Sequence, residues 1–156
     1  MEYLDVNRDN IPNLLQSGGL LDGFAGWGVD ALIPLGVKLK YEAGEVIYEM
    51  GDVNYDLFYI IDGEVEADII GNKLSFGIGL VVGEYSFILK EARESTIIAG
   101  EEGAILYRLS SESYERFLSE HTDIGYRIYK NLASIMSHKF MGMYNGRIQQ
   151  KYRKKC

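Results

Sequence analysis

Polar and apolar residues follow two different periods along this chain. In the segment EVEADI (residues 64–69) apolar residues stand at every second position, the pattern of a strand with one face in solvent. Similar short runs recur from residue 37 to residue 109, with turn signals at Asp62-Gly63 and around Glu102-Gly103. Seven or eight short strands at even spacing favour an antiparallel barrel or jelly roll. We therefore expect a mainly β protein with flanking helices, built on an antiparallel, jelly-roll-like β-roll of about eight strands.

The apolar spacing becomes helical on both sides of this region. Residues 10–35 carry apolar positions at near-helical spacing, and Gly-Gly and Pro breaks divide them into short pieces. The segment SSESYERFLSEH (110–121) opens with serines that can cap a helix and has Glu112 in its first turn. A second C-terminal helix is predicted to begin after Thr122 or Asp123 and to continue through IGYRIYKNLASIMSHKFM.

This last helix carries two apolar stripes. One consists of Ile128, Leu132 and Ile135, and the other, spaced 4-3-4-3, consists of Tyr129, Ala133, Met136, Phe140 and Met143. One stripe suffices to dock the helix on the β-roll, which leaves the other for a partner helix or a lid. The alternative is that both stripes belong to the core. Gly142 and Gly146 each cost roughly 1 kcal/mol relative to Ala, so we expect the helix to bend, fray or end there.

The length of 156 residues fits a single domain. Its expected parts are an N-terminal helical segment (1–36), the β-roll (37–109) and C-terminal helices with a basic tail (110–156). No apolar run reaches the roughly 18–20 residues of a membrane-spanning helix, and the N-terminus lacks the charged-then-apolar order of a signal peptide. We therefore expect a cytoplasmic protein without a transmembrane segment.

The net charge of −7 is unevenly distributed. Six Lys or Arg and no acidic residues follow His138, which leaves 10 basic against 23 acidic residues before it. An acidic body argues against direct nucleic-acid binding. The basic tail suits a membrane surface or a nucleic acid, but we interpret it as cations at the C-terminus of a helix, where the helix dipole favours them.

The residues available for catalysis are few. The single cysteine, Cys156, can form neither a disulfide framework nor a cysteine-based zinc site within one chain. Both histidines, His121 and His138, fall in the C-terminal helices, so the β-roll has none to bind a metal or to activate a serine. Neither a dinucleotide fingerprint nor a P-loop is present. We therefore expect no enzyme activity, no metal and no cofactor, although a metal bound to the purified protein would revive the enzyme hypothesis.

One stretch, GLVVGEYSFILKEAREST (79–96), combines groups that suit a phosphorylated sugar. A Gly-Glu at the start of a helical turn leaves backbone N–H groups free for an anion. Arg93 adds a fork of donors that matches phosphate oxygens, and Glu84 can accept hydrogen bonds from sugar hydroxyls. The alternative is a salt bridge between Glu84 and Arg93 that only closes the loop.

The chain resembles the family of cyclic nucleotide-binding domains from about Phe24 to Lys139. AGEVIYEMGDVNYDLFYIIDGEVEA is similar to the family's run of Gly-Glu, strand, Gly-Asp, aromatic-rich strand and Gly-Glu, and residues 79–96 are similar to its phosphate-binding cassette. The spacing from Glu84 to Arg93 matches without a gap. The glycines in register with the family are Gly44, Gly51, Gly63, Gly79 and Gly83.

The resemblance implies a role for each residue of the site. Glu84 would bind the ribose 2′-hydroxyl, Arg93 the cyclic phosphate, and the amides near Glu84 to Ser86 the remaining phosphate oxygens. The expected ligand-binding residues are Gly83, Glu84, Tyr85, Ser86, Arg93, Glu94 and Ser95. The last helix would move over the base as a lid, with Met136, Phe140 and Tyr144 as candidate lid residues, and would change a partner contact or a dimer interface.

Three residues depart from the family pattern. Val82 replaces the usual Phe, Tyr85 stands where a smaller aliphatic residue is common, and Glu94 follows the arginine where Ala, Thr or Ser is usual. A carboxylate within about 4–6 Å of a phosphate disfavours binding unless Arg93 dominates or Glu94 points away. Alternatively, Glu94 accepts hydrogen bonds from guanine and favours cyclic GMP over cyclic AMP. The sequence leaves both outcomes open.

Two functions follow. The first is a regulatory ligand-sensing module that binds a cyclic mononucleotide, with cyclic AMP first and cyclic GMP a close second, and relays occupancy through the C-terminal helix. The second is a nucleotide-independent interaction module of the same fold. An activator-type output domain would need roughly 60–70 further residues, whereas about 16 follow Phe140. The effect therefore passes to an unidentified protein partner or to a homodimer through the C-terminal helix, or the chain is a fragment.

Overall fold

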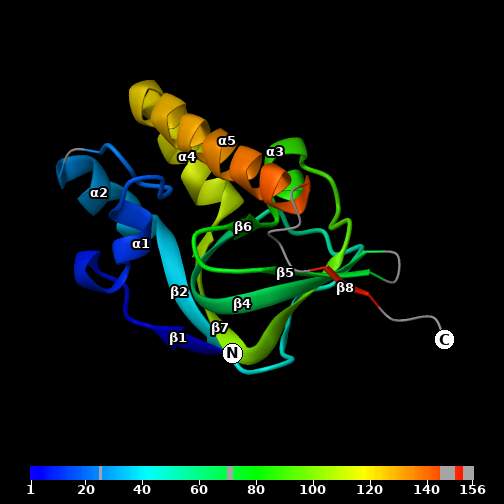
Figure 1. Cartoon of the computed structure of the whole chain (residues 1–156). Helices are drawn as coiled ribbons and strands as arrows, with labels where there is room; N and C mark the ends of the chain where they lie inside the picture. The colour runs from blue at the N-terminus through cyan, green and yellow to red at the C-terminus, as the bar shows by residue number, and fades with distance from the viewer. Residues whose placement is uncertain (25, 70–71, 145–149, 153–156) are drawn as a thin grey trace.

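A curved antiparallel sheet forms most of the computed structural model, which describes residues 1–24, 26–69, 72–144 and 150–152 (Figure 1). Among these residues the eight strands are β1 (Glu2–Leu4), β2 (Gly36–Tyr41), β3 (Val46–Tyr48), β4 (Leu57–Ile69), β5 (Asn72–Phe76), β6 (Val81–Val82), β7 (Thr96–Leu109) and β8 (Gln150–Tyr152). The strand order is β1-β2-β7-β4-β5-β8, with β3 beside β7 and β6 beside β4. The expected antiparallel β-roll with flanking helices is confirmed, and β1 and β8 join it from outside residues 37–109.

The helices lie beside and above this sheet. They are η1 (Arg8–Asn10), α1 (Pro12–Leu15), α2 (Gly26–Leu32), η2 (Ile33–Leu35), α3 (Glu84–Leu89), α4 (Ser111–Glu120) and α5 (Thr122–Tyr144). The Oγ of Ser110 accepts from the N–H of Ser113, so the predicted serine cap of α4 is confirmed. α5 continues through Gly142, while Gly146 lies outside the described residues. None of the described helices is long and apolar enough to cross a membrane.

Two expected turns are not formed. β4 runs through Asp62-Gly63 and β7 runs through Glu102-Gly103, and the two strands pair with each other with register shifts near this point. Gly63 and Gly103 do adopt positive φ, at 74° and 76°. The two glycines therefore lie at bends within two long paired strands and not in hairpin turns. The sequence signal is the same in both cases, because a bulge and a tight turn both need a residue with positive φ.

The two stripes of α5 have different surroundings. Ile128, Leu132 and Ile135 are buried in the cluster that joins the helices to the sheet. On the other stripe Tyr129, Phe140 and Met143 are 40%, 65% and 41% exposed. The alternative that both stripes are core is therefore wrong. Figure 1 shows α5 crossing over the sheet with its C-terminal end beside α3, so the exposed stripe lies next to the segment that carries Glu84.

The close pairing of β4 with β7 at Gly63 makes a specific stability prediction. A Cβ on Gly63 would lie 2.3 Å from the carbonyl O of Gly103, and its φ is unfavourable for other residues. Gly63→Ala should lower the free energy of unfolding by about 2–3 kcal/mol in urea denaturation. Gly77→Ala is the control, because nothing lies within 4 Å of that position; its change should stay within about 0.5 kcal/mol. Equal effects of the two substitutions would contradict the proposed bend.

Candidate functional site

The segment from Gly79 to Thr96, which we call the cassette, connects β5 to β7 through β6 and α3. Gly83 precedes α3 with a φ of 86°. A Cβ there would lie 2.7 Å from Nη1 of Arg93 and 2.8 Å from the carbonyl O of Asp56. Glycine therefore allows the guanidinium to approach the backbone at this point. The first amides of α3, from Glu84 to Ser86, have no intrahelical acceptor and are available to an anion.

Arg93 is the only arginine among the buried side chains of the described residues, at 2% exposure. Its Nη1 donates to the carbonyl O of Gly83 at 3.2 Å, and its Nη2 donates to Oδ1 of Asn54 at 2.9 Å and to the carbonyl O of Asp56 at 2.7 Å. The guanidinium carbon lies 4.1 Å from the ring centre of Tyr48. These contacts hold the plane of the guanidinium in one orientation.

The backbone of Arg93 is held as firmly as its side chain. Its N–H donates to the carbonyl O of Asp52 at 2.9 Å, and its carbonyl accepts from the N–H of Gly51 at 2.8 Å. The loop between β3 and β4 thus binds both ends of the residue.

Burial affects the ionisation of this pair of groups in opposite directions. Desolvation lowers the pKa of Arg93 below its usual value, and nearby acidic groups, led by Tyr48 and Asp56, partly oppose it. Desolvation also raises the pKa of Tyr48, against the field of Arg93. Since the usual pKa of arginine lies far above neutrality, the guanidinium stays charged at neutral pH, and Tyr48, whose pKa is raised, stays neutral beside it.

Two buried polar atoms of the cassette lack a partner. Within the part of the chain that the structure describes, Nε of Arg93 and Oγ of Ser86 make no hydrogen bond. Buried donors, above all charged ones, are normally satisfied. A guanidinium N–H and a serine hydroxyl are both suitable donors to a phosphate oxygen. The cassette therefore holds two buried donors of the kind that phosphate oxygens accept from.

Glu84 has a different partner from the one considered in the sequence. The loop-closing salt bridge between Glu84 and Arg93 is not formed; Oε1 of Glu84 lies 2.5 Å from Nζ of Lys139 on α5. The same Nζ donates to the carbonyl O of Val81 at 2.9 Å. Sequence reasoning missed Lys139 and counted it only among the cations of the tail. No sequence signal points to it, because its contacts cross 55 and 58 positions.

The remaining predicted site residues lie around this centre. Gly83, Ser86 and Ser95 are buried, and Tyr85 is exposed on α3. Glu94 is exposed as well, although its charge still acts on Arg93 and Tyr48. The roles of these residues in ligand binding stay predictions.

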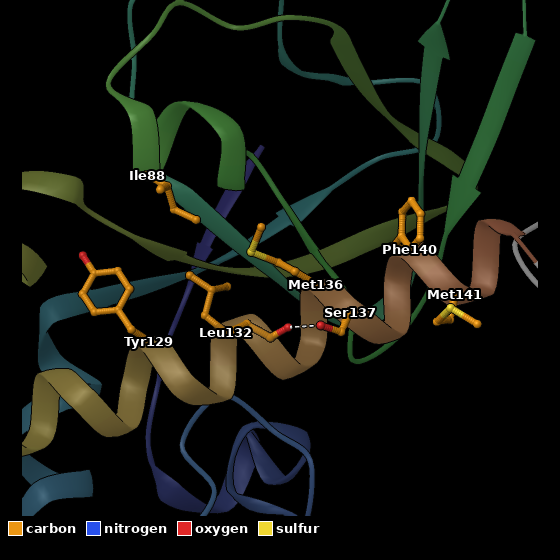
Figure 2. Close-up of a pocket in the computed structure, with 8 residues that line it drawn as sticks. Ile88, Tyr129, Leu132, Met136, Ser137, Phe140 and Met141 are labelled. Carbon is orange, nitrogen blue, oxygen red and sulfur yellow. Dashed lines mark hydrogen bonds between the residues drawn. The ribbon is translucent and has the colours of Figure 1, made fainter.

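Of the three candidate lid residues, two line an apolar cavity of about 620 Å³ between α3 and α5. Figure 2 shows Ile88 of α3 facing α5 across this cavity, with Met136 pointing towards it and Phe140 further along the helix. The rings of Phe87 and Tyr129 lie 6.5 Å apart on the same boundary. Tyr144, at the end of α5, is 78% exposed and does not line this cavity.

A second contact ties the cassette to α4. Lys90 ends α3 with a φ of 58°, an uncommon conformation for a residue other than glycine. Its Nζ binds the carbonyl O of Phe87 and the carboxylate of Glu115 on α4. α3 therefore contacts both C-terminal helices.

The fork of Arg93 should be necessary for the fold as well as for the site. Arg93→Lys keeps a cation, but its ammonium cannot donate to all three acceptors, the carbonyls of Gly83 and Asp56 and the Oδ1 of Asn54. The free energy of unfolding should therefore fall by about 1–3 kcal/mol in a urea titration. Arg116→Lys is the matched control, because Arg116 makes an exposed pair with Glu112; its effect should stay within about 0.5 kcal/mol. A fully stable Arg93→Lys protein would show that the fork is dispensable.

The comparisons with known proteins agree with this architecture. The sequence model of the cyclic nucleotide-binding domain matches residues 38–121, just over half of the chain. None of the curated proteins matches it. A cyclic nucleotide-binding domain from Methylobacillus flagellatus KT is similar in structure, with a TM-score of 0.79 and 20% identity over 92% of this chain and 85% of that one.

Two further solved structures are similar at 22% identity. The catabolite activator protein of Thermus thermophilus has a TM-score of 0.62 over 80% of this chain and 59% of its own, so the chain spans less than two thirds of that activator. PKAR CBD2, solved with Sp-2Cl-cAMPS bound, has a TM-score of 0.56 over 76% of this chain and 82% of its own. At this identity the structures show a shared fold, while the match of the family model shows membership. The chain belongs to the family of cyclic nucleotide-binding domains, which are regulatory and generally non-enzymatic modules.

Proposed function

We propose that this chain is a regulatory module that senses a cyclic mononucleotide bound at the cassette. The observation that carries the proposal is the pair of unpartnered, buried atoms, Nε of Arg93 and Oγ of Ser86, in a segment whose backbone also offers amides. An anion placed there gains a charged donor whose orientation is already set.

Each residue of the site then has a distinct task. Arg93 binds the cyclic phosphate through the donor that its protein contacts leave free, while Asn54 and Asp56 keep the guanidinium in place. The first amides of α3 bind the other phosphate oxygens. Glu84 accepts from the ribose 2′-hydroxyl once its carboxylate is accessible.

The preferred nucleotide is cyclic AMP, with cyclic GMP as a close second. PKAR CBD2, a structural neighbour, was solved with a cyclic AMP derivative, which supports testing cyclic AMP first. Glu94 is the residue that most directly affects the choice, because its exposed carboxylate lies near enough to act on Arg93. In this position it either repels the phosphate or accepts hydrogen bonds from a guanine.

Occupancy is relayed from the cassette to α5. The supporting contact is the ring pair of Phe87 with Tyr129, which joins α3 to α5. Beside it Ile88 and Met136 line the apolar cavity between the two helices. A shift of α3 on ligand binding changes these contacts and so biases the position of the helix. We place the protein in the cytoplasm and expect no direct binding to nucleic acid, as the sequence predicts.

A second candidate function is a nucleotide-independent interaction module. The observation that favours it is that Lys139 occupies the carboxylate of Glu84 while apolar residues of α5 remain exposed. In this case Arg93 serves the fold alone, and the exposed stripe binds an unidentified protein or a second copy of the chain.

Isothermal titration calorimetry distinguishes the two functions. Cyclic AMP should bind with a Kd on the order of 10 µM, as expected for a ligand that gains about 0.3 kcal/mol per heavy atom. Cyclic GMP should bind within about tenfold of this value. The open-chain 5′-AMP is the control and should bind more weakly, because its phosphate is not held in the ring. Absence of heat with either cyclic nucleotide at millimolar concentration, for a folded protein, would reject the sensing function.

Glu94→Ala tests the choice of nucleotide. Removing the exposed carboxylate should strengthen cyclic AMP binding by about 2- to 5-fold, because a repulsion of about 0.5–1 kcal/mol is removed. Glu91→Ala removes an exposed carboxylate from the same loop and is the control. If cyclic GMP binding instead falls more than about tenfold and cyclic AMP binding does not change, Glu94 reads the guanine and cyclic GMP is the ligand.

The exposed stripe of α5 predicts self-association. Light scattering at high protein concentration should show a dimer, and Phe140→Asp should convert it to a monomer, because Phe140 is 65% exposed on that stripe. Ser134→Asp changes an exposed residue away from the stripe and should leave the dimer intact. A monomeric wild-type protein, with and without nucleotide, would count against the dimer.

A further inference from the structure

The ammonium of Lys139 makes three contacts at the edge of the cassette. Its Nζ lies 2.5 Å from Oε1 of Glu84 and donates to the carbonyl O of Val81 at 2.9 Å. It also lies 4.5 Å from the ring centre of Phe76, over the aromatic face. An ammonium has three donors and no acceptor, so these contacts satisfy it.

This ion pair is the most buried one among the described residues. The side chains of Lys139 and Glu84 are 13% and 17% exposed, whereas each of the other pairs has at least one side chain 32% exposed or more. Exposed pairs contribute little because water and salt screen them, and a partly buried pair is screened less. The pair can therefore hold α5 against the β-roll.

Among the described residues, Lys139 also makes a polar contact between the last turns of α5 and the sheet, through the carbonyl O of Val81. Ser137 and His138 bond to the carbonyls of Ala133 and Ser134, within α5 itself. The apolar residues that follow Lys139 in the described helix are exposed, namely Phe140, Met141, Met143 and Tyr144. Release of Lys139 would therefore leave this end of the helix with few contacts.

The position of the ammonium conflicts with a bound ribose. Glu84 is the carboxylate to which the proposed function assigns the ribose hydroxyl, so the inference rests on that proposal. A ribose hydroxyl and the ammonium would both form a charge-assisted hydrogen bond with this carboxylate, but only the ammonium adds the attraction of an opposite charge in a partly buried site, so a hydroxyl alone does not displace it. The Nζ also covers the face of Phe76, which is 3% exposed, and so fills the space beside the carboxylate. A nucleotide has to move Lys139, using binding energy gained by its phosphate at Arg93.

We infer that Lys139 and Glu84 form a latch that the cyclic nucleotide opens. When the latch is closed, the ammonium takes the place of the ribose and the end of α5 is held on the β-roll. When the nucleotide binds, its ribose takes Glu84 and the end of α5 is released. The fraction of molecules with a closed latch lowers the apparent affinity for the nucleotide. The free energy needed to open the latch is also the free energy that couples the nucleotide site to α5.

Lys139→Met tests the latch by removing the ammonium while keeping most of the apolar stem. It should bind the nucleotide about 3- to 10-fold more tightly than the wild type in calorimetry, because no closed state competes. Lys139→Arg keeps a cation and should bind close to the wild-type affinity. Lys130→Met removes the same charge from an exposed position of α5 and should also leave the affinity unchanged. Lys139→Gln, measured alongside, makes the same comparison if Lys139→Met lowers the folded fraction in circular dichroism.

Hydrogen exchange of the amides in residues 137–144 gives a readout that does not depend on affinity. In the wild type the nucleotide should accelerate exchange there, because it frees the helix end. In Lys139→Met exchange should already be fast, and the nucleotide should change it little.

The outcomes separate the latch from the proposed function. Weaker binding by Lys139→Met, or slower exchange of α5 in the wild type with nucleotide, would show that Lys139 helps to hold the ligand and would overturn the latch alone. Unchanged affinity and unchanged exchange in Lys139→Met would also overturn the latch alone. Binding by Lys139→Met with no binding by the wild type would support a latch that is almost always closed. No binding by any of these folded proteins would overturn the proposed function and the latch with it.

Discussion

A guanidinium buried inside a β-roll has to be surrounded by acceptors, and much of the cassette follows from this requirement. An unpaired buried charge costs several kcal/mol. Arg93 avoids most of this cost through the carbonyls of Gly83 and Asp56 and the side chain of Asn54. Its backbone is fixed to Gly51 and Asp52 at the same time. The segment between β3 and β4 and the cassette are thus held together around one charge.

The elements that depend on local patterning could be predicted from the sequence. The change from alternating to helical spacing after Leu109 locates α4, and Ser110 caps it where expected. The predicted hairpin turn at Asp62-Gly63 was wrong. The dipeptide is a local signal, whereas the conformation of β4 at this point depends on its pairing with β7. Gly63 bends β4 against β7 at the level of Ala104, and this pairing joins residues about 40 positions apart.

The site divides in the same way. Gly83 and Arg93 stand close together in the chain, and the family pattern identified both before their contact could be seen. Asn54 and Lys139 were not identified, because each reaches the cassette across a long stretch of chain and has an ordinary polar side chain. The docking of α5 decides where Lys139 lies, and this docking depends on the buried faces of Ile128, Leu132 and Ile135 rather than on residues near the site.

Because Lys139 belongs to the same chain as Glu84, dilution cannot remove it from the site. A group held in this way acts at an effective concentration that depends on the geometry of its tether and not on the amount of protein present. In a nucleotide sensor restrained by such a group, the ligand concentration needed for a response depends in part on how α5 positions Lys139 beside Glu84. The contribution of this contact to the threshold would therefore be the same in cells that express little of the protein and in cells that express much of it.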